Sequence, residues 1–191
     1  FSIGNPNVPA PDEINATAEK LLDTLPSPAA HGYTSAQGDA DVRSSIASYI
    51  EQAFSFPARA SELYLTVGAA AAVTISVRAV TSSPDDEVIV LAPSFTEYSV
   101  FVGNAGAKLI VVPPKKPGFG INFEGLEKAI TANTRALIID SPNNPTGVIY
   151  TEDELKRLGR LLTEKEKEFG GAIYLISDEP YRDITYGKDV P

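Results

Sequence analysis

The chain has 191 residues, 43% of them hydrophobic and 21% charged, so it is long and apolar enough to bury one substantial core. Its net charge of −9 would repel nucleic-acid phosphates and anionic lipid, and no run of Lys or Arg offsets it locally. With no cysteine and one histidine, His31, disulfides, thiolate metal sites, zinc centres and serine–histidine triads are disfavoured. No apolar run approaches the roughly 20 residues that span a bilayer. Together, these features predict a cytoplasmic protein with no metal site and no nucleic-acid or membrane partner.

Prolines divide the first thirty residues into an extended arm and a short helix. We therefore predict that residues 1–32 form an N-terminal arm with a short helix and that residues 33–191 form one large domain. Apolar residues recur at helical spacing over 14–25 and again over 42–53, and we expect each helix to pack that face inward.

From Glu62 onward, short β-rich runs alternate with amphipathic helical runs. This alternation is typical of a parallel sheet with crossover helices and predicts an α/β fold with a mostly parallel central sheet flanked by helices. The predicted strands cover residues 62–67, 87–92, 108–113, 135–140 and 172–177.

The clearest predicted helix begins at a capping box formed by Thr151 and Glu154 and ends at Gly170 and Gly171. The residues expected on its buried face are Leu155, Leu158, Leu162 and Phe169.

Ligands of open parallel sheets bind at the carboxyl ends of the strands. Two turns of interest follow predicted strands at that edge, one at Gly68 and one at Phe95. Gly68, Ala69 and Ala70 end one strand and open a helix, so their backbone amides could bind a phosphate; a plain strand-to-helix turn is the alternative. Phe95 follows the next strand and could stack on a planar ligand, although the pattern taken by itself favours packing in the core.

The segment DSPNNPTG, residues 140–147, is the most specific motif. Its two prolines and its glycine fix the backbone, while Asn143 and Asn144 present amides that can hydrogen-bond a ligand oxygen. An ordinary loop rarely needs this order of residues, so we interpret the segment as functional.

The segment SDEPYRDITY places Asp178 at the end of an apolar strand and Tyr181 three residues later. A partly buried carboxylate there is costly unless it meets a cation, such as a protonated ring nitrogen. The alternative is a helix N-cap before Pro180.

SPNNPTG followed about thirty residues later by SDEPY resembles the class I and II aminotransferases, which are fold-type I pyridoxal-phosphate enzymes. The resemblance extends over the whole chain through the arm SIGNP, the segment HGYTSAQGDADVR and the turn VGAAAAV. It implies a fold-type I α/β architecture, an incomplete large domain and pyridoxal 5′-phosphate as the cofactor.

Carried over to this sequence, the resemblance implies that Asp178 holds the pyridine nitrogen protonated. Asn144 and Tyr181 would bond the phenolic oxygen of the cofactor. Asp178 would thereby set the strength of the electron sink, and the other two would favour the ionised phenolic oxygen.

The resemblance assigns the remaining contacts to other segments. Phe95 matches the stacking aromatic, and the amides of Gly68, Ala69 and Ala70 match the phosphate site. Tyr33 matches a tyrosine that reaches the neighbouring subunit's phosphate, which implies a homodimer with shared sites, and Gly4 and Asn144 match residues near the substrate.

The family's covalently bound lysine is expected beyond Pro191, since no lysine here has the serine-rich context it requires, and we interpret Lys188 as a surface residue. The family's phosphate-binding arginine and carboxylate-binding arginine are also expected outside the chain. The resemblance implies an aminotransferase that moves an amino group between an amino acid, with aspartate as first candidate, and a 2-oxo acid. A pyridoxal-phosphate-dependent carbon–sulfur β-lyase and a non-catalytic ligand-sensing or assembly domain of the same fold are the alternatives.

Overall fold

The computed structural model describes residues 8–187 and 190–191, and the chain forms two compact units, Phe1–Leu65 and Thr66–Pro191. The division at residue 65 falls later than the expected end of the arm at residue 32. The assignment of residues 33–191 to one cofactor-binding domain stays a prediction. Gly4, the expected substrate contact in the arm, lies outside the described residues.

The first unit is helical, as the periodicity predicts. Its elements are α1 (Asp12–Thr24), α2 (Ser27–His31), α3 (Ala40–Phe54) and the 3-10 turn η1 (Ala60–Glu62). The expected inward face is wrong for α1, of which no residue is buried. For α3 it is confirmed only in part: Ile46 and Ile50 are half-buried, and the fully buried residues are Arg43 and Ala47. Arg43 is drawn inward because its guanidinium donates to the carbonyls of Gly38 and Ala60.

The second unit contains a four-stranded parallel sheet in the order β2-β1-β3-β4. Its strands are β1 (Glu87–Leu91), β2 (Lys108–Val112), β3 (Thr134–Asp140) and β4 (Tyr174–Asp178), which confirms four of the five predicted strands. The strand predicted at 62–67 is wrong: the segment pairs with no strand, and the Leu65 amide donates to the Gln37 carbonyl instead. An apolar run becomes a strand only where a neighbouring strand accepts its hydrogen bonds.

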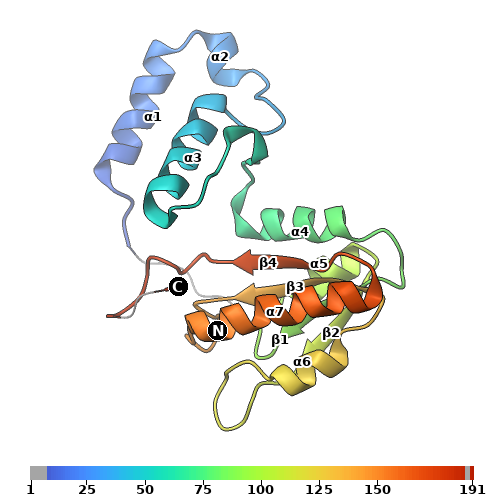
Figure 1. The fold of residues 1–191 in the computed structure, drawn as a ribbon. Helices are drawn as coiled ribbons and strands as arrows, with labels where there is room; N and C mark the ends of the chain where they lie inside the picture. The colour runs from blue at the N-terminus through green and yellow to red at the C-terminus, as the bar shows by residue number, and fades with distance from the viewer. Residues whose placement is uncertain (1–7, 188–189) are drawn as a thin grey trace. The chain divides into compact units, whose positions relative to one another are not determined.

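Helices cover both faces of this sheet (Figure 1). One face carries α4 (Gly68–Val80) and α5 (Tyr98–Asn104), and the other carries α6 (Phe123–Ala129) and α7 (Glu152–Phe169). Alternate residues of each central strand point to opposite cores, as strand geometry requires. Val88, Val90, Ala136 and Ile138 belong to the α4/α5 core, and Ile89, Leu91, Leu137 and Ile139 to the α6/α7 core.

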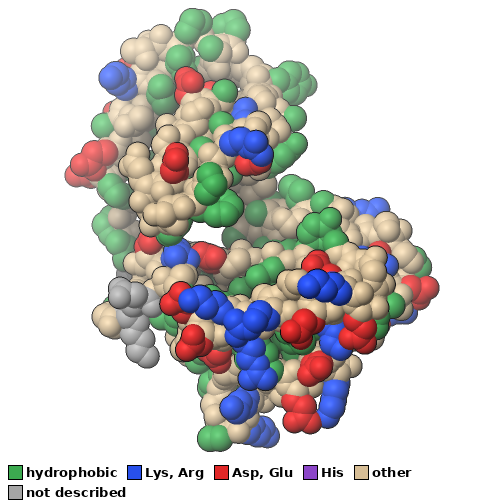
Figure 2. Space-filling model, viewed as in Figure 1, with side chains coloured by type: hydrophobic (Ala, Val, Ile, Leu, Met, Phe, Trp, Pro, Cys, Tyr) green, Lys and Arg blue, Asp and Glu red, His purple; other side chains and the backbone are tan. Residues whose placement is uncertain are grey.

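The long helix α7 has the predicted ends. Glu154 and Thr151 form the reciprocal capping box, and Gly170 ends the helix with a φ of 72°. Acidic and basic side chains are interspersed over the surface of this unit (Figure 2), and on α7 they include the ion pair of Lys156 with Glu152. Within residues 8–187 we find no helix of sufficient length and apolarity to cross a membrane.

The connections of the sheet run in opposite directions from its centre. The chain leaves β1 through α5 towards β2, and it leaves β3 through α7 towards β4. The carboxyl ends of β1 and β3 therefore lie side by side at a topological switch point, where open α/β sheets form a crevice. Phe95 follows β1, Asp140 ends β3, and Asp178 ends β4.

Candidate active site

A cavity of about 180 Å³ lies at the carboxyl edge of the sheet. It brings together most of the residues that the sequence singles out, although they come from four separate segments. Its lining comprises Ala69, Ala70, Phe95, Phe101, Asp140, Asn144, Asp178, Pro180 and Tyr181. Asp178 and Asn144 thus face one pocket, the juxtaposition on which the sequence interpretation depends.

Asp178 is held by a buried tyrosine. The hydroxyl of Tyr98, on α5, donates to Asp178 Oδ2 at 2.8 Å, and the Tyr98 side chain is 1% exposed. Burial, followed by this hydrogen bond to Asp178, raises the pKa of Tyr98, so its hydroxyl stays a neutral donor. Residues 180–183 form turns and not a helix, so Asp178 is not the helix N-cap that was the alternative.

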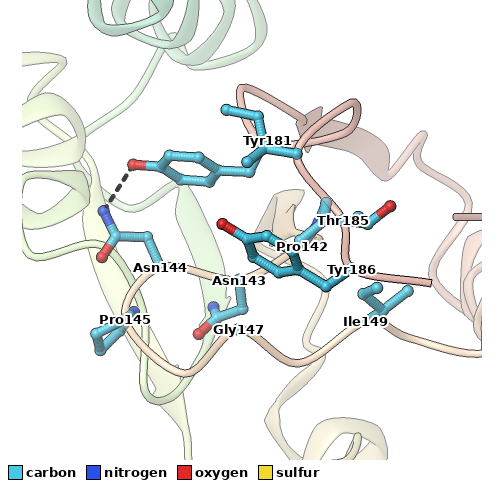
Figure 3. A pocket seen from close by; sticks show the side chains of 10 residues that line it. Pro142, Asn143, Asn144, Pro145, Gly147, Ile149, Tyr181, Thr185 and Tyr186 are labelled. Atoms are coloured by element: carbon cyan, nitrogen blue, oxygen red, sulfur yellow. Dashed lines mark hydrogen bonds between the residues drawn. The ribbon is translucent and has the colours of Figure 1, made fainter. Parts of the chain in front are cut away.

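Asn144 and Tyr181 line both this cavity and a neighbouring pocket, which is the one that Figure 3 shows. Asn144 Nδ2 donates to the Tyr181 hydroxyl at 3.1 Å, and the two side chains point toward one another (Figure 3). This bond uses a lone pair of the tyrosine oxygen and leaves the hydroxyl proton for another acceptor. An anionic ligand oxygen beside the pair would accept a hydrogen bond from the Tyr181 hydroxyl.

The turn that carries Asn144 is stabilised by its neighbour, Asn143. Asn143 Oδ1 accepts from the Thr146 amide at 3.0 Å, and its Nδ2 donates to the Pro93 carbonyl at 3.1 Å. The interpretation that both asparagine amides face a ligand is therefore wrong for Asn143, which is buried and bonded internally. Periodicity could not separate the two, because the turn geometry decides which amide points outward.

The first turn of α4 and the ring of Phe95 contribute to the same pocket. Gly68 has a φ of +79°, and its amide donates to the Thr66 carbonyl at 2.9 Å. The helix has no side-chain cap, so the amides of Ala69 and Ala70 remain available to an anion. Phe95 packs edge-on against Tyr98, with ring centroids 5.7 Å apart. The assigned roles of these residues stay predictions.

Asp140 is a pocket residue to which the sequence analysis gives no role. It lies opposite Asp178 in the strand register and is 5% exposed. Burial raises its pKa to about 6; the Asn144 amide opposes this effect, and the charge of Asp178 adds to it. The signal was available, because Asp140 ends an apolar strand as Asp178 does. For Tyr98, also missed, the sequence carries no comparable signal.

Tyr33, the expected contact with a neighbouring subunit's cofactor, belongs to the first unit. Its side chain is fully exposed. Its predicted role depends on a second subunit and stays a prediction.

The model of the family "Aminotransferase class I and II" matches residues 1–191. The chain belongs to this family. This aminotransferase-family chain is 32% identical over 189 residues to the Bacillus subtilis protein named "Probable N-acetyl-LL-diaminopimelate aminotransferase", covering 98% of the chain and 45% of the relative. It is 33% identical over 188 residues to an aspartate aminotransferase of Streptomyces avermitilis, covering 98% and 44%.

Solved structures of family members have the same fold. An aminotransferase from Eubacterium rectale superposes with a TM-score of 0.96 at 49% identity, covering 100% of this chain and 48% of that one. A mutant of Thermus thermophilus aspartate aminotransferase gives 0.88 at 30% identity, covering 98% and 47%. The aminotransferase-family chain thus has the fold-type I architecture and spans less than half the length of these relatives.

Proposed function

We propose that this chain forms the cofactor-holding part of a pyridoxal-phosphate-dependent aminotransferase, which moves an amino group between an amino acid and a 2-oxo acid. The observation that carries the proposal is the pocket at the carboxyl edge, where Asp178, the Asn144–Tyr181 pair and the first turn of α4 face one space. A planar ligand with a cationic nitrogen, an anionic ring oxygen and a phosphate matches these three features.

The residues present fit the cofactor. When bound, pyridoxal phosphate supplies an electron sink, because its protonated ring withdraws electrons from the substrate's α-carbon. Asp178, oriented by Tyr98, holds the proton at the ring nitrogen. Asn144 and Tyr181 donate to the ring oxygen and favour its ionised form, and the amides of α4 bind the phosphate.

The names of the relatives favour transamination and suggest the first substrate to test. Several are named aspartate aminotransferase, so we propose aspartate as the amino donor. A cytoplasmic homodimer, with Tyr33 reaching the partner's cofactor and Gly4 near the substrate, belongs to the same proposal. Pyruvate formed from cystathionine without an added 2-oxo acid would instead indicate the β-lyase reaction.

The test replaces Asp178 by Ala in the full-length protein. Because the carboxylate fixes the ring proton, we expect turnover with aspartate and 2-oxoglutarate to fall at least about hundredfold. The circular-dichroism spectrum should stay unchanged. Ser177→Ala, a change at the neighbouring exposed position of β4, is the matched control and should retain activity. Near-normal turnover of Asp178→Ala would contradict the proposed role.

A further inference from the structure

The carboxylate of Asp140 occupies the switch point of the sheet, one strand away from Asp178. The two residues are direct partners in the parallel register of β3 and β4, and both line the cavity at the carboxyl edge. Two acids therefore face one small space at the place where an open α/β sheet binds its ligand.

Among the described residues, one oxygen of Asp140 has hydrogen-bond donors and the other has none. Oδ2 accepts from the Asn144 amide at 2.9 Å and, more weakly, from Asn143 Nδ2 at 3.5 Å. Oδ1 is buried and has no hydrogen-bond partner within the described part of the chain. An unpartnered buried carboxylate oxygen is costly, so the fold alone gives no reason to keep it.

The described groups around Asp140 provide no positive charge. Asp178 on β4, Tyr98 on α5 and Tyr150 ahead of α7 are the titratable groups that interact with it, and Tyr181 also lines the cavity. Among residues 8–187, no Lys, Arg or His lines this cavity. The described part of the pocket therefore holds negative charge without a positive partner, which a cationic ligand would balance.

We propose that Asp140 is a second carboxylate for the cationic ring of the bound cofactor, a positioning residue whose charge adds to that of Asp178 and keeps the ring nitrogen protonated. This inference rests on the proposed function, because that function supplies the cation. Through Oδ2 the same side chain holds the turn that presents Asn144, so it links both ends of the ring's binding site.

Asp140 should release a proton when the cation binds near pH 6. Burial raises the pKa of Asp140 to about 6, so near pH 6 about half of this carboxyl group carries a proton in the ligand-free protein. A cation that binds beside it favours the ionised form, lowers its pKa and releases that proton. At pH 8 the group is already ionised, and no proton is left to release.

The experiment measures proton release when pyridoxine 5′-phosphate binds to the full-length protein. This ligand has the ring and the phosphate but no aldehyde, so no covalent bond to a lysine contributes. Calorimetry in two buffers with different ionisation enthalpies gives the number of protons. We expect the wild type to release up to about half a proton more than Asp140→Asn at pH 6, and the two to agree at pH 8.

Two further measurements complete the test. At pH 8, Asp140→Asn should bind the ligand about tenfold more weakly, the order expected when one nearby charge is lost. Asp85→Asn removes the same charge from the exposed partner of Lys108 and should match the wild type in both respects. In a ¹³C NMR titration of the wild type, the carboxyl signal of one aspartate should titrate near pH 6 without ligand. With ligand bound, that carboxyl group should stay ionised at pH 6, and Asp140→Asn should lack this signal.

The outcomes separate the inference from the proposed function. Equal proton release and equal affinity of the wild type and Asp140→Asn overturn the role of Asp140 but leave the cofactor assignment standing. A wild type without a carboxyl signal that titrates near pH 6 also overturns it, even if the variant does not fold. Failure of the folded wild type to bind pyridoxine 5′-phosphate overturns both.

Discussion

Two buried aspartates lie at opposite ends of the same sheet and are treated differently by the fold. Asp86, just before β1, accepts from the amides of Ser82 and Ser83 at 2.7 and 2.9 Å and pairs with Arg135 Nε at 2.9 Å. Asp140, at the end of β3, keeps one oxygen without a partner among the described residues. The amino edge is therefore built for stability, and the carboxyl edge retains a cost that a ligand can offset.

Their pKa shifts have opposite signs. The Ser82 amide, with further help from Ser83 and Arg135, lowers the pKa of Asp86 against the effect of burial. The stability that Asp86 contributes is present above its unfolded pKa and is lost as the pH falls through its lower folded pKa. For Asp140, whose pKa is raised, the contribution is present below the unfolded pKa and is lost as the pH rises through about 6.

The largest expected effect on stability comes from the amino edge. Asp86→Asn breaks the ion pair of this buried carboxylate with the partly exposed Arg135 and removes a charged acceptor from two amides. We expect a loss of about 2–4 kcal/mol in the free energy of unfolding. Urea denaturation of the cofactor-free protein measures it. Asp85→Asn changes the neighbouring exposed carboxylate and should shift the urea midpoint little. A similar shift for both variants would contradict the structural role of Asp86.

The same substitution at the carboxyl edge should have the opposite sign. Asp140→Asn keeps an acceptor for the Asn144 amide and removes a buried charge, so the cofactor-free protein should gain about 1 kcal/mol at pH 8. The gain should shrink as the pH falls from 6 to 4, because the wild-type carboxyl group becomes neutral there. Urea midpoints across this pH range test the sign, and a loss of stability at pH 8 would contradict it.

The contrast also shows which features the sequence could predict. The four strands of the sheet and the ends of α7 follow from apolar runs and caps, which are local properties. The segment 62–67 has the same apolar character, yet it forms no strand because pairing depends on a neighbour. Likewise, the helical periodicity of α1 predicts a helix but not the surface on which it would pack.

Side-chain roles at the site divide in the same way. Asp178 and Asn144 could be singled out because family motifs carry them, and one cavity brings both together. Asn143 was misjudged because the folded turn uses its amide internally. Tyr98 carries no signal along the chain, because its importance arises from its contact with Asp178 on another element. Asp140 does end an apolar strand, but its closeness to Asp178 follows only from the pairing of β3 with β4.

The smallest expected effect on stability comes from Tyr98, and it distinguishes the two edges most sharply. Tyr98→Phe keeps the buried ring but removes the hydroxyl that donates to Asp178 Oδ2, so the cofactor-free protein should lose about 1 kcal/mol or less. Without this donor the Asp178 carboxylate is oriented less firmly, so it should hold the proton at the ring nitrogen less well. Turnover should fall about tenfold with little change in KM.

The ¹⁵N chemical shift of labelled pyridoxine 5′-phosphate bound to Tyr98→Phe should move in the direction of a less protonated ring nitrogen. Ser99→Ala, an exposed change at the next position of α5, controls for effects on the helix. If Tyr98→Phe lost as much stability as Asp86→Asn while the bound ring kept its wild-type chemical shift, the role of Tyr98 would be structural, like that of Asp86. A conserved urea midpoint with an altered ring shift would place it with the ligand-holding groups of the carboxyl edge.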